Sequence, residues 1–211
     1  MDSRNLVAKA VAVFAPWNTL DISIDIEKRI PVGGGLGGGS SNAGVVLRWL
    51  NDTLGRPLSE GQLRAEALKL GADVCFFLSG GTALVSGIGE VIVPITLPQH
   101  DHYVLVIPPI SILSGEIYKT FDEIYPDADV APDIPTEWPE MGINDLKQAV
   151  WVMHPQMYRI ETELETTGLG PVVLSGSGST LFIRCLDEVS AIQTAALVRD
   201  CVPECKVLVT K

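Results

Sequence analysis

The chain has 211 residues and a formal net charge of −11, with 15 Lys and Arg against 26 Asp and Glu. This length fits one large domain or two small ones, at about 100–200 residues per domain. The excess of acidic residues argues against sequence-independent binding of nucleic acid, which requires clustered Lys and Arg. No run of about 18 apolar residues predicts a membrane-spanning helix, and a content of 46% hydrophobic residues is typical of a globular protein.

The first half of the chain mixes helical and strand patterns. Residues 5–14 predict a short helix, and the strict alternation from Leu20 to Ile26 predicts a half-buried strand. A run of glycines at 33–39 then opens a second helix. A third helix is expected from Ser59 to Leu70, where Ser59 and Gln62 resemble a capping box. A short apolar run at 71–78 leads into strands expected at 82–86, 91–97 and 103–107.

The second half begins at Pro108-Pro109, a seam that divides the chain into expected domains of residues 1–108 and 109–211. Helices are predicted near 114–125, 145–152, 155–166 and 187–200, the last capped by Asp187. Residues 126–140, rich in proline and acidic side chains, predict an exposed loop. Short strands at 172–174 and 180–185 flank a glycine turn, and 206–210 closes the chain. This order favours an antiparallel sheet covered by helices, an α+β fold.

The cysteines, at positions 75, 185, 201 and 205, form no CxxC pair and no zinc-like spacing. We therefore expect reduced, mostly buried thiols and no metal site of their own. The first residues lack a basic region followed by an apolar one, so they do not read as a secretory signal. A cytoplasmic, reducing compartment is the simplest interpretation.

The glycine run can bind an anion through its backbone. Six glycines between Gly33 and Gly39 permit positive φ angles and a close approach of a ligand to the main chain. The free N–H groups and the dipole at the start of the following helix favour phosphate. Ser40 and Ser41 add hydroxyl groups that can reach phosphate or a magnesium ion.

Three other interpretations of the glycine run fit the sequence less well. A flexible linker is disfavoured because Leu36 lies inside the run and an apolar helix follows. A P-loop is excluded because no Lys follows the glycines. The dinucleotide pattern fits Gly33, Gly35 and Gly38, but a polar turn and a helix follow where that fold needs a second parallel strand.

The segment from Pro31 to Ala43 resembles the ATP-binding motif of the GHMP kinases, a family of small-molecule kinases. Segments 70–77, 81–90 and 174–179 resemble the same family in order and spacing, so the resemblance covers essentially the whole chain. The long glycine form is most similar to the branch that phosphorylates a cytidine diphosphate sugar alcohol in non-mevalonate isoprenoid synthesis. The resemblance implies two domains, the first a partial ribosomal-protein-domain-2-like fold and the second ferredoxin-like.

The resemblance also implies ATP with Mg²⁺ as cofactors and a hydroxyl of the small-molecule substrate as acceptor. The residues implied to wrap the ATP phosphates are Pro31, Val32, Gly33, Gly34, Gly35, Leu36, Gly37, Gly38, Gly39, Ser40 and Ser41. Asp73 is the implied catalytic carboxylate, which accepts or orients the hydroxyl proton. The implied substrate-binding residues are Tyr118, Ser175, Gly176, Ser177 and Gly178. From the residues alone, Asp73 fits a helix cap, Tyr118 a partly buried helix residue, and 175–178 a plain hairpin turn.

Two features depart from the family pattern. The family carries an upstream strand with a Pro-x-Lys-x-Asn motif, for which Lys9 is a poor substitute, and Cys75 stands where proline is usual. We expect this N-terminally truncated form to be marginally stable, or to self-associate through the surface that the missing strands would cover. The alternatives to the proposed kinase are a non-catalytic nucleotide-binding relic and another family kinase of homoserine or mevalonate type. The compartment would be the plastid stroma in a eukaryote.

Overall fold

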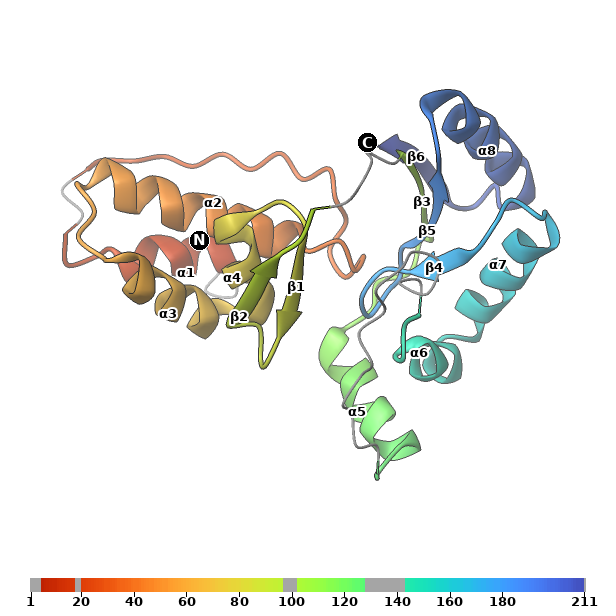
Figure 1. Ribbon diagram of the computed structural model, residues 1–211, viewed down its shortest axis with the longest axis horizontal. Helices are drawn as coiled ribbons and strands as arrows, with labels where there is room; N and C mark the ends of the chain where they lie inside the picture. The colour runs from red at the N-terminus through yellow and green to blue at the C-terminus, as the bar shows by residue number, and fades with distance from the viewer. Residues whose placement is uncertain (1–4, 18–19, 97–101, 128–142, 211) are drawn as a thin grey trace. The chain divides into compact units, whose positions relative to one another are not determined.

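The computed structural model describes residues 5–17, 20–96, 102–127 and 143–210 (Figure 1). Their contacts divide the chain into two compact units. Unit 1 comprises residues 1–29 and 37–98, and unit 2 comprises residues 30–36 and 99–211. The first part of the glycine run therefore packs with unit 2, while the rest of the run belongs to unit 1.

The described residues of unit 1 form four helices and a two-stranded antiparallel sheet: α1 (Leu6–Val13), α2 (Gly38–Thr53), α3 (Glu60–Leu70), α4 (Ala72–Ser79), β1 (Ala83–Ser86) and β2 (Val91–Pro94). Its core is formed where one apolar face of each helix meets the others. Phe14, Leu47, Leu50 and Leu63 are fully buried there. Each helix thus buries one side and leaves the other exposed, as an amphipathic helix does.

The helix starts of unit 1 follow local capping rules. Asn5 accepts a hydrogen bond from the backbone N–H of Val7 at 2.9 Å. Ser59 and Gln62 form the predicted capping box at the start of α3. The predicted capping box is confirmed, because a cap depends only on residues two or three positions apart.

The strand predicted from Leu20 to Ile26 is wrong. Among the residues described in unit 1, no strand forms a hydrogen-bonded ladder with this segment. Ile22 is half-buried and packs on the core, whereas Leu20 and Ile26 are 39% and 40% exposed. Alternation specifies which side chains share a face, but a strand also needs a partner backbone.

In unit 2, the part of the chain that the structure describes forms a four-stranded antiparallel sheet and four helices. The elements are β3 (His102–Ile107), α5 (Ser114–Ile124), α6 (Lys147–Met153), α7 (Pro155–Thr166), β4 (Val172–Leu174), β5 (Leu181–Cys185), α8 (Glu188–Cys201) and β6 (Lys206–Thr210). The strand order is β4-β5-β3-β6. The predicted antiparallel sheet and the α+β class are confirmed. Most of the predicted loop at 126–140 lies outside the described residues.

Two apolar rows cross the sheet of unit 2 and face the helices. One row consists of Val172, Ile183, Val104 and Val209. The next consists of Leu174, Leu181, Val106 and Val207. Helices α7 and α8 cover this face (Figure 1) and bury it in the core of the unit.

The buried carboxylate of Glu161 on α7 joins two helices of unit 2. It pairs with the ammonium group of Lys147 on α6 and accepts a hydrogen bond of 3.0 Å from the indole of Trp151. Glu161 is only 2% exposed, so these two partners compensate a charge that would otherwise be costly to bury.

None of the helices described is both long and apolar enough to cross a lipid bilayer. By contacts, the strand at His102–Ile107 belongs to the sheet of unit 2. The family-domain boundary after residue 108 stays a prediction.

Candidate active site

The first part of the glycine run is held to unit 2 by its carbonyl groups. Three successive carbonyl oxygens, those of Gly33, Gly34 and Gly35, each accept a hydrogen bond. Their donors are Ile112 N at 3.1 Å, Thr180 N at 3.2 Å and Ser175 Oγ at 2.9 Å. The preceding carbonyl, of Val32, accepts from Ser111 Oγ at 3.2 Å. The loop therefore rests on the segment after β3 and on the turn between β4 and β5.

This arrangement leaves a row of N–H groups free. In a trans peptide unit the N–H points away from the carbonyl of the preceding residue. Because the carbonyls of Gly33, Gly34 and Gly35 point into unit 2, the N–H groups of Gly34, Gly35 and Leu36 point the other way. Among the hydrogen bonds of the described residues, none uses these three donors. Successive free N–H groups of this kind form a concave site for an anion.

Glycine is required at two positions of this stretch. Gly33 and Gly35 both have a φ of +71°, a conformation that residues with a side chain rarely adopt. A methyl group on Gly35 would overlap the carbonyl oxygen of Ser175 and lie 2.8 Å from that of Gly178. The loop can therefore approach the turn at 175–178 only without a Cβ atom.

The second part of the run starts a helix, as the sequence predicts. Gly37 is the N-cap of α2 with a φ of +61°, and no side chain caps the helix. The first intrahelical bond joins Ser41 N to Gly37 O at 2.8 Å, so the N–H groups before Ser41 have no helical partner. With the helix dipole, they offer a second set of donors to phosphate.

Asp73 lies in the first turn of α4 and is exposed. Phe77, one helical turn later, lies on the same face of α4. A Cβ atom on Gly37 would meet the Phe77 ring at 2.8 Å, and one on Gly44 would meet its Cβ at 2.9 Å. The face of α4 that carries Asp73 is therefore the face packed against the start of α2, so unit 1 brings these two predicted site elements together.

Helix α5 connects the predicted substrate residues of unit 2. The hydroxyl groups of Ser114, on α5, and Ser177, in the glycine turn, are 2.6 Å apart. Tyr118 lies one turn after Ser114 on the same face of α5 and is 57% exposed. The phenol ring is thus available to stack on a flat ligand beside the turn at 175–178.

The turn itself is largely committed to holding the structure. Ser175 donates a hydrogen bond to the carbonyl oxygen of Gly35. Ser177 is only 7% exposed, and its hydroxyl group is bonded to that of Ser114. Ser111 and Thr180, which also hold the loop, were not singled out as site residues from the sequence. Their partners lie about 80 to 150 residues away along the chain, so no local pattern reveals the contact. The one sequence feature that points to them is their position beside the predicted motifs.

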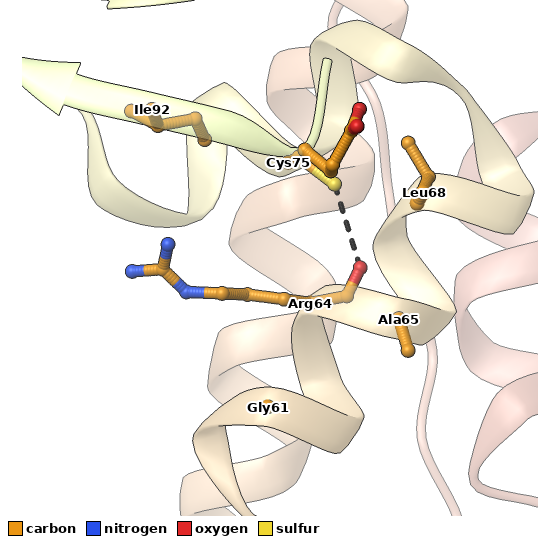
Figure 2. Close-up of a pocket in the computed structure, with 7 residues that line it drawn as sticks. Gly61, Arg64, Ala65, Leu68, Cys75 and Ile92 are labelled. Atoms are coloured by element: carbon orange, nitrogen blue, oxygen red, sulfur yellow. Dashed lines mark hydrogen bonds between the residues drawn. The ribbon is translucent and has the colours of Figure 1, made fainter. Parts of the chain in front are cut away.

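A cavity of about 260 Å³ lies on another side of α4 (Figure 2). Its lining residues are Gly61, Arg64, Ala65, Leu68, Cys75, Glu90 and Ile92. The Cys75 thiol donates to the carbonyl oxygen of Arg64 at 3.4 Å, and burial raises the pKa of the thiol. Cys75 is two residues after Asp73, about 200° further around the helix. The cavity is therefore separate from the face that carries the predicted site.

The loop contains no charged side chain between Ile30 and Ala43. Within the described part of the chain, no three His, Cys, Asp or Glu side chains form a metal cluster. The groups that this loop offers to an anion are therefore backbone N–H groups and the hydroxyls of Ser40 and Ser41.

Comparisons with known proteins identify the family of the chain. The family description "GHMP kinases N terminal domain" matches residues 5–81. The chain is 36% identical over 197 residues to 4-diphosphocytidyl-2-C-methyl-D-erythritol kinase from Persephonella marina, covering 85% of this chain and 68% of that one. The kinase of the same name from Bacteroides thetaiotaomicron is 34% identical over 183 residues, covering 84% and 67%. The chain thus spans about two thirds of these relatives.

Solved structures confirm the predicted fold. A crystal structure of 4-(cytidine 5'-diphospho)-2C-methyl-D-erythritol kinase superposes with a TM-score of 0.77 at 28% identity, covering 99% of this chain and 78% of that one. Homoserine kinase from Cytophaga hutchinsonii superposes with a TM-score of 0.69 at 16% identity, covering 99% and 76%. The second likeness concerns the fold alone.

Proposed function

The chain belongs to the 4-diphosphocytidyl-2-C-methyl-D-erythritol kinases of the GHMP kinase family, and on this premise we propose that it phosphorylates 4-diphosphocytidyl-2-C-methyl-D-erythritol with ATP. The reaction would serve isoprenoid precursor synthesis by the non-mevalonate route. The observation that carries the proposal is the row of outward N–H groups on the glycine loop, which suits the phosphates of ATP.

In this proposal, residues 31–41 bind the phosphates. Gly34, Gly35 and Leu36 supply backbone donors, and Ser40 and Ser41 supply hydroxyl groups at the start of α2. The donor set fits a polyphosphate, because it offers successive N–H groups and because residues 31–41 contain no carboxylate. Mg²⁺ would accompany ATP and neutralise phosphate charge. This ion commonly keeps several waters and takes few protein ligands, so it does not require a cluster of carboxylates.

Asp73 would act on the acceptor hydroxyl. The oxygen of the substrate's 2-hydroxyl forms a bond to the γ-phosphorus, the bond to the bridging β–γ oxygen breaks, and ADP leaves. The hydroxyl proton passes to the Asp73 carboxylate, which is exposed on the face of α4 packed against the start of α2. Phosphoryl transfer of this kind needs a positioned carboxylate and no covalent intermediate with the protein.

The cytidine part of the substrate would be bound in unit 2. The exposed ring of Tyr118 can stack on the cytosine base, and the turn at 175–178 lies one helical turn away along α5. The flat ring and the base each present an apolar face, so stacking removes both from water.

An ADP-release assay tests this function. It uses ATP, Mg²⁺ and the cytidyl substrate with the 211-residue chain, with the chain preceded by any residues that its gene encodes upstream, and with Asp73→Asn in each. We expect turnover that Asp73→Asn lowers at least 100-fold. Homoserine and mevalonate serve as competing acceptors, and faster turnover of either overturns the substrate assignment. ATP binding without turnover of any acceptor would identify a nucleotide-binding relic instead.

We also infer that the chain self-associates through unit 1 and acts in the cytoplasm. The extended segment 20–26 exposes Leu20 and Ile26, and the sheet of unit 1 exposes Val85, Val91 and Val93. Such an exposed apolar surface suits contact with a second copy of the chain.

The compartment is inferred from the cysteines, because four free thiols suit a reducing compartment. Sedimentation over a hundredfold concentration range tests the first inference, and a monomer throughout would contradict it.

A further inference from the structure

Asn144, in the turn before α6, is fixed by three hydrogen bonds. Its Nδ2 donates to the carbonyl oxygens of Leu174 at 2.9 Å and Gly176 at 2.7 Å. Its Oδ1 accepts from the backbone N–H of Leu146 at 3.0 Å. Both amide hydrogens and the amide oxygen are therefore engaged, so the side chain has one orientation.

The two carbonyls that Asn144 binds lie on either side of Ser175. Ser175 N also donates to Thr180 O at 2.9 Å, and Ser175 O accepts from Gly178 N at 2.9 Å. The backbone of Ser175 is thus held on both sides, which fixes the direction in which its side chain leaves the backbone. That direction allows Ser175 Oγ to donate to Gly35 O.

The contact with Gly35 determines where the loop presents its donors. The carbonyl of Gly35 and the N–H of Leu36 belong to one planar peptide unit and point in opposite directions. Without the hydrogen bond from Ser175 to this carbonyl, the peptide group between Gly35 and Leu36 could rotate. The Leu36 N–H would then no longer point in the same direction as those of Gly34 and Gly35. Glycine at this position makes such a rotation easy, because no Cβ atom opposes it.

We propose that Asn144 is a positioning residue for the phosphate-binding loop, acting through Ser175 on the peptide unit between Gly35 and Leu36. The inference rests on the proposed function, since it concerns a loop that binds the phosphates of ATP. Asn144 does not touch the nucleotide in this scheme. It sets the direction of a backbone donor two contacts away.

The variant Asn144→Asp tests the proposal. Aspartate keeps the acceptor for Leu146 N but loses both donors and places a carboxylate against two carbonyl oxygens. We expect the Kd for MgATP, measured by calorimetry, and the KM for ATP to rise about tenfold, as expected for lost hydrogen bonds that orient a donor. The KM for the cytidyl substrate should rise by a smaller factor than the Kd for MgATP.

The matched control is Asn51→Asp in unit 1. Asn51 is 5% exposed, and its amide also bridges backbone groups, donating to Leu58 O at 3.0 Å and accepting from Leu58 N at 3.1 Å. This variant should lower the melting temperature as Asn144→Asp does, because a carboxylate oxygen would then face the carbonyl oxygen of Leu58 to which the amide donates. It should leave the Kd for MgATP within twofold, which separates a loss of stability from a loss of positioning.

A double-mutant cycle tests the route through Ser175. Ser175→Ala alone should weaken MgATP binding about as much as Asn144→Asp, and the double variant should be no weaker than either single one. Additive effects, or an Asn144→Asp variant that binds MgATP within twofold of the unmodified chain, would overturn this inference alone. An unmodified chain that fails to bind MgATP would overturn the proposed function together with it.

Discussion

Residues 33–35 and 37–39 belong to one glycine run, yet the two stretches have different surroundings. Gly35 lies against the backbone carbonyls of Ser175 and Gly178. In the second stretch, a Cβ on Gly37 would meet the Phe77 ring, and one on Gly39 would lie 3.8 Å from a methyl group of Leu6. Backbone held in a hydrogen-bonded turn cannot move aside, whereas a side chain can rotate. A Cβ atom would therefore be harder to accommodate at Gly35 than at Gly37 or Gly39.

The largest effect is expected for Gly35→Ala. The substitution combines a positive φ, which costs about 1–2 kcal/mol for a residue with a side chain, with overlap against the turn. We expect the free energy of unfolding to fall by more than about 2 kcal/mol and the Kd for MgATP to rise more than tenfold. Urea unfolding and calorimetry measure the two quantities. Wild-type values for both would show that the loop does not pack on the turn in solution.

Gly37→Ala should cost less, although its φ of +61° is similar. The backbone strain remains, but the Phe77 ring can turn away, so we expect a loss of about 1–2 kcal/mol in the free energy of unfolding. Combining it with Phe77→Leu tests whether ring overlap contributes, since the smaller side chain would then recover part of the loss. A loss as large as that of Gly35→Ala would remove the distinction between the two stretches.

Gly39→Ala should have the opposite sign. Gly39 lies inside the first turn of α2 and has room for a methyl group. Alanine is favoured over glycine in a helix by about 0.8–1 kcal/mol in an interior position, and less is expected at this terminal one. Thermal unfolding should therefore show a small rise in Tm. A clear fall would indicate that the helix begins after residue 39.

Thr180→Val should have the smallest effect. Thr180 holds Gly34 through its backbone N–H, and its hydroxyl is fully buried without a partner among the described residues. Valine has nearly the same shape, so the free energy of unfolding should stay within about 0.5 kcal/mol or rise. A loss above about 1 kcal/mol in urea unfolding would mean that the hydroxyl is bonded in solution.

The sequence predicted features that depend on near neighbours. The capping box at Ser59, the cap at Asp187 and the helix after the glycine run are confirmed, because each depends on a few consecutive residues. The support of the loop was not predictable in this way. The hydrogen bond that supports the loop joins Ser175 to Gly35, which lies 140 residues away in the sequence. In the same way, the alternation at 20–26 gives no information on whether a partner strand is present.

The absence of charge in the loop has a consequence for the rate at which a nucleotide arrives. From Ile30 to Ala43 no side chain is charged, while the whole chain carries −11. The long-range field therefore repels an anionic ligand, and only short-range N–H dipoles attract it. Added salt screens the repulsion over distances beyond about 10 Å at 0.1 M and barely affects donors in contact with phosphate. Association should accordingly become faster as ionic strength increases.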